Sequence, residues 1–363
     1  MLLSLLLEYS YGSPKKMFNK KNYKIPIDKF INNALYDPKN GYYMQKIPFG
    51  KKGDFITAPN ISKIFSEMIF LWLLSYWQKF HMNKRINIVE LGAGNGEMIS
   101  QIISSAKNYK IFYNKCDFII FEKSNKLIKL QKEKLKNQNI KWLKNLDKLQ
   151  NKPTIFFGNE FLDALPIKQF INFKGNWYER YVQKHKGIFY FTKVKCNMKR
   201  VENKIKLKLS KNQNFLEISF EEIKIIKKLN NIIKKNNGCI LFIDYAHSNQ
   251  KMFDTLQAVK KHKKADILND IGNADISHMV NLSFLRKITK NLNLKIKFTT
   301  QRKFLLNLGI MKRAEILANR ASFLEKANIF YRINRLIDKR QMGELFKVIL
   351  LYKKNKEFNL GFK

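Results

Sequence analysis

Residues 86–96, INIVELGAGNG, decide the fold that we expect for this chain of 363 residues. The first four form a short apolar run typical of a buried strand, and the apolar residues of 98–106 recur at helical spacing. Glycines in the turn between them would let the backbone approach a ligand closely, and the first amides of the helix would donate hydrogen bonds to it. The stretch therefore predicts a strand, a ligand-binding turn and a helix.

The spacing of the three glycines indicates the kind of ligand. A dinucleotide fingerprint reads G-x-G-x-x-G, whereas Gly92, Gly94 and Gly96 stand at every second position. Glu90, just before them, would repel a pyrophosphate but would attract the ammonium group of a methionine tail. We therefore expect an adenosyl ligand that carries an amino acid. An ordinary strand-to-helix turn is the alternative.

Four more apolar runs have the length of buried strands, and helical segments alternate with them. They lie at residues 117–121, 140–143, 154–157 and 238–244. This alternation predicts a doubly wound α/β fold with a parallel sheet. The interval before the last run is unusually long. Its alternating aromatic and charged residues around Lys186-Gly187 predict an antiparallel β insertion.

The chain divides into three parts. Residues 1–80 read as an N-terminal helical extension, with helices expected at 27–43, interrupted by a turn, and at 61–80. Residues 81–350 form the core, whose insertion at about 170–225 is expected to bind the second substrate. Residues 351–363 form a C-terminal tail.

The balance of charges is strongly basic. The chain carries 70 Lys and Arg against 28 Asp and Glu, a formal net charge of +42. Such a charge raises nucleic acid or an anionic membrane as a partner. However, the lysines are spread through every segment together with many Asn, Ile and Phe, as drift in the composition of a whole proteome would produce. A real polyanion-binding surface stays open as the alternative.

The cysteines and the first residues bear on the location of the protein. Cys116, Cys196 and Cys239 form no C-x-x-C pair, so neither a metal site nor a disulfide framework is indicated. The apolar run 1–7 is too short to span a bilayer, and Met17 opens a segment that reads like an alternative start. No Arg precedes Arg85, which argues against a transit peptide. We expect a bacterial cytoplasmic protein, with a mitochondrial location as the alternative.

Polar residues follow three of the predicted strands. Glu122 ends the second strand, where a carboxylate can accept hydrogen bonds from ribose hydroxyls. Asn159, Glu160 and Asp163 follow the fourth strand and could orient a nitrogen nucleophile such as a guanidinium. Asp163 could instead act only on a helix dipole. His247 follows the fifth strand, where a structural role is more common than a role as general base.

Together these segments resemble the MidA-like methyltransferase family, which includes a mitochondrial assembly factor of respiratory complex I that methylates a protein arginine. The similarity runs in one order from about residue 37 to about residue 346. The matching stretches are GYY at 41–43, GDFITAP at 53–59, ELG at 90–92, NEFLDALP at 159–166, DY at 244–245, DTL at 254–256, DIS at 275–277, LGI at 308–310 and MGE at 342–344. The resemblance implies a class I methyltransferase fold, S-adenosyl-L-methionine as cofactor and a protein arginine, possibly in a complex I subunit, as acceptor.

We also form a hypothesis about the role of each residue, from its type and its place in the chain. Cofactor binding falls to the glycine loop with Glu90 and Glu122, and to Gly53, Asp54 and Thr57, whose loop would close over the cofactor. Orientation of the acceptor nitrogen falls to Asn159, Glu160 and Asp163.

The chain departs from the family at several positions. Ala93, Asn95 and Glu97 replace a proline, an arginine and a threonine of the family loop. Ala246 replaces a glycine, and Met279 and Asn281 replace a histidine and an aspartate. Two alternatives therefore stay open, a cofactor-binding assembly factor without catalysis and, because of the basic charge, a nucleic-acid methyltransferase.

Overall fold

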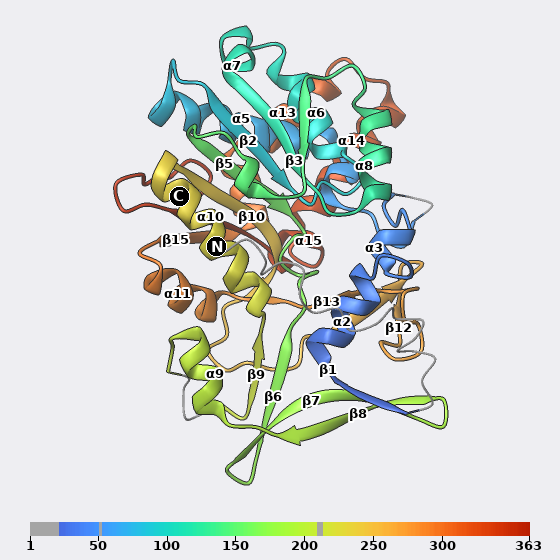
Figure 1. Cartoon of the computed structure of the whole chain (residues 1–363). Coiled ribbons are helices and arrows are strands. Elements are labelled where there is room, and N and C mark those ends of the chain that lie inside the picture. The colour runs from blue at the N-terminus through green and yellow to red at the C-terminus, as the bar shows by residue number, and fades with distance from the viewer. Residues whose placement is uncertain (1–21, 51–52, 209–212) are drawn as a thin grey trace.

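A mixed central sheet forms the core of the protein in the computed structural model, which describes residues 22–50, 53–208 and 213–363. The alternative start at Met17 lies outside these residues. The sheet has the strand order β15-β16-β10-β5-β2-β3-β4, with β14 beside the end of β10 (Figure 1). The strands are β2 (Ile86–Leu91), β3 (Cys116–Phe121), β4 (Ile140–Leu143), β5 (Thr154–Asn159), β10 (Gly238–His247), β14 (Val280–Asn281), β15 (Lys295–Thr300) and β16 (Phe346–Tyr352).

One strand runs against the others. β16 pairs antiparallel with both β10 and β15, whereas β2 to β5 and β10 pair in parallel. The predicted doubly wound α/β fold is confirmed, and five of its strands lie where the sequence predicts them. The expectation of a purely parallel sheet needs correction because β16, which follows β15 after a helical segment, is inserted antiparallel between β10 and β15.

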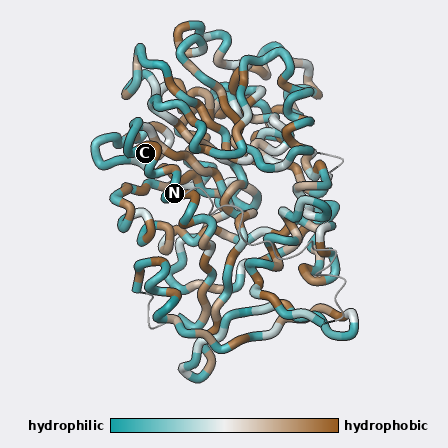
Figure 2. Tube along the Cα trace, in the orientation of Figure 1, coloured by the Kyte–Doolittle hydropathy of each residue, from teal (hydrophilic) through white to brown (hydrophobic). Residues whose placement is uncertain are grey.

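Helices cover both faces of the sheet. Successive residues of β10 point to opposite faces, so that Leu241 joins one apolar core and Phe242 the other. The first core includes residues of α5 (Lys63–His81), α6 (Glu97–Ala106), α7 (Lys110–Lys115), α12 (Gln301–Asn307), α13 (Ile310–Ala318) and α14 (Phe323–Ile337). The second includes residues of the 3-10 turn η1 (Leu146–Lys148), α10 (Phe220–Asn236) and α11 (Leu282–Asn291). In Figure 2 hydrophobic segments run through the interior strands.

The predicted antiparallel insertion forms a sheet of its own at one end of the molecule (Figure 1). It consists of β6 (Lys168–Phe173), β7 (Asn176–His185), β8 (Ile188–Lys195) and β9 (Phe215–Ile218), with α9 (Met198–Ile205) before β9. A strand that the sequence did not indicate, β1 (Tyr23–Pro26), pairs with β7. The N-terminal region is thereby tied to the insertion, and α2 (Ile27–Tyr36) and α3 (Tyr42–Gln45) follow from that point.

The remaining elements of the described structure are a small sheet and three helices. A small antiparallel sheet contains β11 (Gln257–Lys260), β12 (Lys263–Ala265) and β13 (Asp275–Ser277). The short helices are α4 (Ala58–Ile61) and α15 (Met342–Leu345), and α8 (Asn125–Lys134) follows β3. Beyond β16, the ring of Phe358 packs at 5.4 Å from Trp72 of α5. Within the described ranges, no helix combines the length and the apolar character needed to cross a bilayer.

Candidate active site

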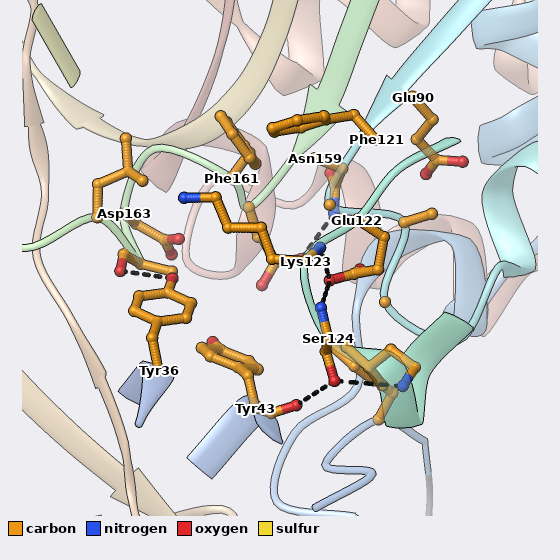
Figure 3. Close-up of a pocket in the computed structure, with 18 of the residues that line it drawn as sticks. Tyr36, Tyr43, Glu90, Phe121, Glu122, Lys123, Ser124, Asn159, Phe161 and Asp163 are labelled. Carbon is orange, nitrogen blue, oxygen red and sulfur yellow. Dashed lines mark hydrogen bonds between the residues drawn. The ribbon is translucent and has the colours of Figure 1, made fainter. Parts of the chain in front are cut away.

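A cavity of about 290 Å³ lies at the carboxyl ends of β2, β3 and β5, where an open α/β sheet usually binds its ligand. The N-terminal helices and loops form its other wall. Eight of the eleven predicted site residues line it: Thr57, Glu90, Gly92, Gly94, Glu122, Asn159, Glu160 and Asp163. Figure 3 shows Glu90 and Glu122 at one end of the cavity, and Asp163 and Tyr36 at the other.

The glycine loop needs its glycines for two reasons. Gly92 and Gly94 have φ angles of +65° and +53°, a region that costs other residues about 1–2 kcal/mol. A Cβ atom on Gly94 would also lie 3.0 Å from the ring of Phe49, and one on Gly92 would lie 2.9 Å from the ring of Phe161. Both rings line the cavity, so any side chain on the loop would push into the binding space.

Glu90 is buried near the end of β2, with one carboxylate oxygen, Oε2, that has no hydrogen-bond partner in the described structure. Burial raises its pKa to about 8, against the opposing effect of a hydrogen bond from the backbone amide of Ile99. A bound ammonium group would supply the missing partner and stabilise the charged carboxylate. The site therefore fits the amino-acid end of S-adenosyl-L-methionine.

Glu122 is held rigidly at the end of β3. Its Oε1 accepts hydrogen bonds from the amides of Lys123 at 2.8 Å and Ser124 at 2.9 Å. Its Oε2 accepts a longer one of 3.4 Å from Nε2 of Gln131, which also donates to the carbonyl of Gly94 at 2.9 Å. Gln131, which the sequence analysis did not single out, thus joins the glycine loop to the strand end that carries Glu122.

Asn159, the last residue of β5, and the segment after it supply three polar side chains to the cavity, of which Asp163 lies at the other end (Figure 3). Nδ2 of Asn159 donates to Oε1 of Glu160 at 2.8 Å, while its Oδ1 has no partner within the described residues. Glu160 has a φ of +53°. Such an angle is uncommon for a residue other than glycine, and residues that adopt it cluster at functional sites. Burial and then the nearby Asp244 raise the pKa of Glu160 to about 8.

Two further carboxylates belong to this end. Asp244, in the last part of β10, accepts hydrogen bonds on Oδ2 from the amides of Phe161 at 3.1 Å and Leu162 at 2.7 Å, and so fixes the segment after β5. Asp275 of β13 lines the cavity and accepts a hydrogen bond of 2.7 Å from the hydroxyl of Tyr43. Burial, followed by Asp244, Glu160 and Asp275, raises the pKa of Asp163 well above its usual range.

Aromatic rings of the N-terminal region form the wall that faces these acids. Tyr36 and Tyr43 stack with their ring centres 5.7 Å apart, and Tyr43 stacks on Phe49 at 6.5 Å. All three line the cavity. The negative faces of aromatic rings attract cations. The acids and the rings therefore make this end suited to a positively charged group.

Three predicted cofactor residues stand behind the cavity wall. Asp54 accepts hydrogen bonds from the hydroxyl of Tyr42 at 2.7 Å and from the amide of Lys261 at 2.8 Å, so it ties its loop to the small sheet. Gly53 passes so close to Pro48 that a Cβ atom would lie 2.0 Å from that carbonyl oxygen. Gly96, the N-cap residue of α6, has a left-handed backbone conformation and faces Gln131. None of the three lines the cavity, and neither does His247.

Two residues of the glycine loop that differ from the family pattern, Asn95 and Glu97, have defined partners. Asn95 donates to Oδ1 of Asn60 at 2.9 Å and joins the glycine loop to the N-terminal wall. Glu97 forms an ion pair with Lys134 and accepts a hydrogen bond of 2.6 Å from Gln101. The altered loop is therefore held in place by its new side chains.

Comparison with known proteins shows the family to which the chain belongs. Residues 68–299 match a family model described as "Putative S-adenosyl-L-methionine-dependent methyltransferase". Several proteins named protein arginine methyltransferase NDUFAF7, mitochondrial, are similar to this chain. The protein of Xenopus tropicalis is 28% identical over 351 residues, which cover 89% of this chain and 81% of the relative. The protein of Danio rerio is 29% identical, and the match covers 89% of this chain and 82% of the relative. The Caenorhabditis elegans homologue is 28% identical, and the match covers 99% of this chain and 94% of the homologue.

A solved structure shares the fold. It is a COG1565 superfamily member from Burkholderia thailandensis bound to S-adenosyl-homocysteine, with a TM-score of 0.76 and 22% sequence identity, covering 94% of this chain and 89% of its own.

Proposed function

Because the chain belongs to this family of S-adenosyl-L-methionine-dependent methyltransferases, we propose that its acceptor is an arginine side chain of a protein. The observation that carries the proposal is the meeting of Glu160, Asp163 and Asp275 at one end of the cavity, opposite stacked aromatic rings. Burial raises the pKa values of these three carboxylates, and a bound cation would stabilise their charged forms. A guanidinium is a planar cation with five N–H donors, which suits several carboxylates at once.

The residues of the chain share the work of the transfer. S-adenosyl-L-methionine supplies an activated methyl group on a sulfonium, which the acceptor nitrogen attacks in line, so that the carbon–sulfur bond breaks and its electron pair stays on sulfur. Glu90 holds the ammonium of the cofactor, and Glu122 lies where its ribose is expected. Glu160 and Asp163 orient the guanidinium.

One proton must leave the guanidinium when the new carbon–nitrogen bond forms. Glu160 is suited to accept it because burial raises its pKa to about 8. This value is closer to the pKa of the methylated guanidinium than the pKa of an exposed carboxylate is. The partner-free Oδ1 of the neighbouring Asn159 offers a further acceptor for a guanidinium N–H. Both roles require the segment after β5 to stay in its strained conformation, which Asp244 maintains.

The identity of the acceptor protein extends the proposal. The family resemblance supports a subunit of respiratory complex I, whose assembly the methylation would aid, and the names of the NDUFAF7 relatives support an arginine in a protein.

The cytoplasm remains the proposed location, supported by the three free cysteines Cys116, Cys196 and Cys239, which suit a reducing compartment. Fractionation of cells that make the protein tests the location.

Variants of the acceptor end test the proposal. Asp163→Asn and Glu160→Gln should leave the Kd for S-adenosyl-L-methionine within about twofold, because these residues lie away from Glu90 and Glu122. They should slow methyl transfer into extracts of cells that lack this protein by roughly a hundredfold or more. Glu221→Gln, at an exposed carboxylate on the cavity rim, is the matched control. Transfer by Asp163→Asn at the wild-type rate would refute the assignment.

A further inference from the structure

The first turns of α14 expose a continuous apolar stripe. Four of its side chains are strongly solvent-exposed: Phe323 at 88%, Leu324 at 71%, Tyr331 at 65% and Phe330 at 38%. With the exposed Ala327, these residues stand at positions i, i+1, i+4, i+7 and i+8, which is the spacing of one face of a helix. We call these five residues the α14 stripe.

The α14 stripe belongs to a helix that is anchored in the core. Ile333, Leu336 and Ile337 of the last turns are buried in the core on one side of the central sheet. The first turn is fixed by a capping box, in which Ser322 and Glu325 satisfy each other's backbone amides. The stripe is therefore a rigid surface outside the core, and large exposed apolar patches mark interaction sites.

Arginines gather around the same helix. The chain has ten arginines among its 70 basic residues, and five of the ten lie between residues 313 and 340. Arg313 pairs with Glu67 at 2.7 Å. Within the described ranges Arg320, Arg332 and Arg335 form no ion pair. Drift toward lysine cannot explain a local excess of arginine, and guanidinium groups bind phosphate in a bidentate manner.

The charge around the stripe selects among possible occupants. Between residues 311 and 340 there are eight basic residues against three acidic ones, so a second copy seated on the same surface would bring like charges together. Nucleic acid would use the arginines but would leave the phenylalanine and leucine side chains in water. An apolar helical face flanked by cations matches helices that lie in the interface of an anionic membrane.

We propose that the α14 stripe and its flanking arginines dock this protein on the surface of an anionic phospholipid bilayer. Phe323, Leu324 and Tyr331 enter the boundary between headgroups and acyl chains, while Arg320 and Arg332 contact lipid phosphates. The helix lies on the bilayer and does not cross it, because its other face stays packed in the core. The proposal concerns a surface away from the catalytic residues and does not depend on the identity of the methyl acceptor.

Flotation of the purified full-length protein with lipid vesicles tests the proposal. One set of vesicles contains equal parts of phosphatidylcholine and phosphatidylglycerol, and the other contains phosphatidylcholine alone. The protein should float with the anionic vesicles and remain in solution with the neutral ones. The double substitution Phe323→Ser, Leu324→Ser should weaken binding to the anionic vesicles by about tenfold or more.

A matched control separates the stripe from exposed apolar side chains and basic charge elsewhere. Ile188→Ser, Tyr190→Ser removes two exposed apolar side chains of β8, at 70% and 40% exposure, and should leave flotation unchanged. Both variants should retain S-adenosyl-L-methionine binding, which shows that they fold. The proposal is overturned if the wild-type protein does not float with anionic vesicles, if the α14 double variant floats equally well, or if the wild type is a dimer that this variant converts to a monomer.

Discussion

The Gly94→Ala substitution tests whether the glycine loop shapes the cofactor end of the cavity. The added methyl group meets two costs. A φ of +53° costs alanine about 1–2 kcal/mol, and the Cβ position lies 3.0 Å from two atoms of the Phe49 ring and 3.2 Å from a third. Because Phe49 lines the cavity and stacks on Tyr43, it cannot move away without disturbing the wall. We expect a loss of about 2 kcal/mol in the free energy of unfolding.

Cofactor affinity should fall together with stability. A ring displaced toward the ligand by a few tenths of an ångström removes good contacts, and a loss of 1.4 kcal/mol or so raises Kd about tenfold. Calorimetric titration with S-adenosyl-L-methionine measures the Kd, and thermal denaturation measures the stability. Gly175→Ala is the matched control, because Gly175 also has a positive φ, +77°, but no atom lies within 4 Å of its Cβ position. The Gly175→Ala control should lose stability but keep the cofactor affinity of the wild type. A Gly94→Ala protein that binds the cofactor as tightly as the wild type would refute the reasoning.

Two further substitutions, Glu90→Gln and Tyr43→Phe, and the pH dependence of stability and of methyl transfer test the roles of the site residues. Glu90→Gln should raise the Kd for S-adenosyl-L-methionine by roughly tenfold or more, measured by calorimetry, because the ammonium loses its charged partner; equal affinity would count against that pairing. The pKa of Glu90 rises from 4.5 to about 8 on folding, so its contribution to stability is full below pH 4.5 and is lost as the pH rises through about 8. The melting temperature of the cofactor-free Glu90→Gln protein should therefore vary less over this range than that of the wild type, and parallel pH profiles would contradict this. The kcat/KM for methyl transfer should rise with pH up to about 8 as Glu160 ionises, and a flat profile would exclude its titration from the reaction. Tyr43→Phe removes the hydroxyl that orients Asp275 and should lower kcat/KM about tenfold with an unchanged cofactor Kd; unchanged kcat/KM would make that hydrogen bond irrelevant to the acceptor.

The sequence predicts that Glu90, the glycine loop and Glu122 meet at one end of the cavity, because these residues are close together in the chain. Glu90 and the glycines belong to one strand and turn, and Glu122 ends the next strand, so the order of a parallel sheet brings them together. The acceptor end is harder to predict. Asp275 reaches the cavity from the small sheet, 112 positions after Asp163 in the chain, and only the packing of the small sheet against α2 shows this.

Other features escaped prediction for physical reasons. Strand β1 gains its stability from pairing with β7, far along the chain, and four residues alone give no clear pattern. Gln131 is one polar residue in a lysine-rich helix, and nothing in its neighbourhood distinguishes it before the fold places it against Glu122. Asp54 and Gly53 belong to a distinctive stretch, but their contacts support the loop from behind. A family pattern does not separate residues that touch a ligand from residues that hold the loop.

Identification of the methylated amino acid tests the central claim most directly. Extract from cells that lack this protein is incubated with the purified protein and S-adenosyl-L-methionine labelled in its methyl group, and the labelled protein fraction is hydrolysed and analysed by chromatography. We predict label in methylated arginine, and roughly a hundredfold less of it when Asp163→Asn replaces the wild type. Label in methyllysine, in nucleic acid or in no product would contradict the assignment of the carboxylate-lined end of the cavity to an arginine of a protein.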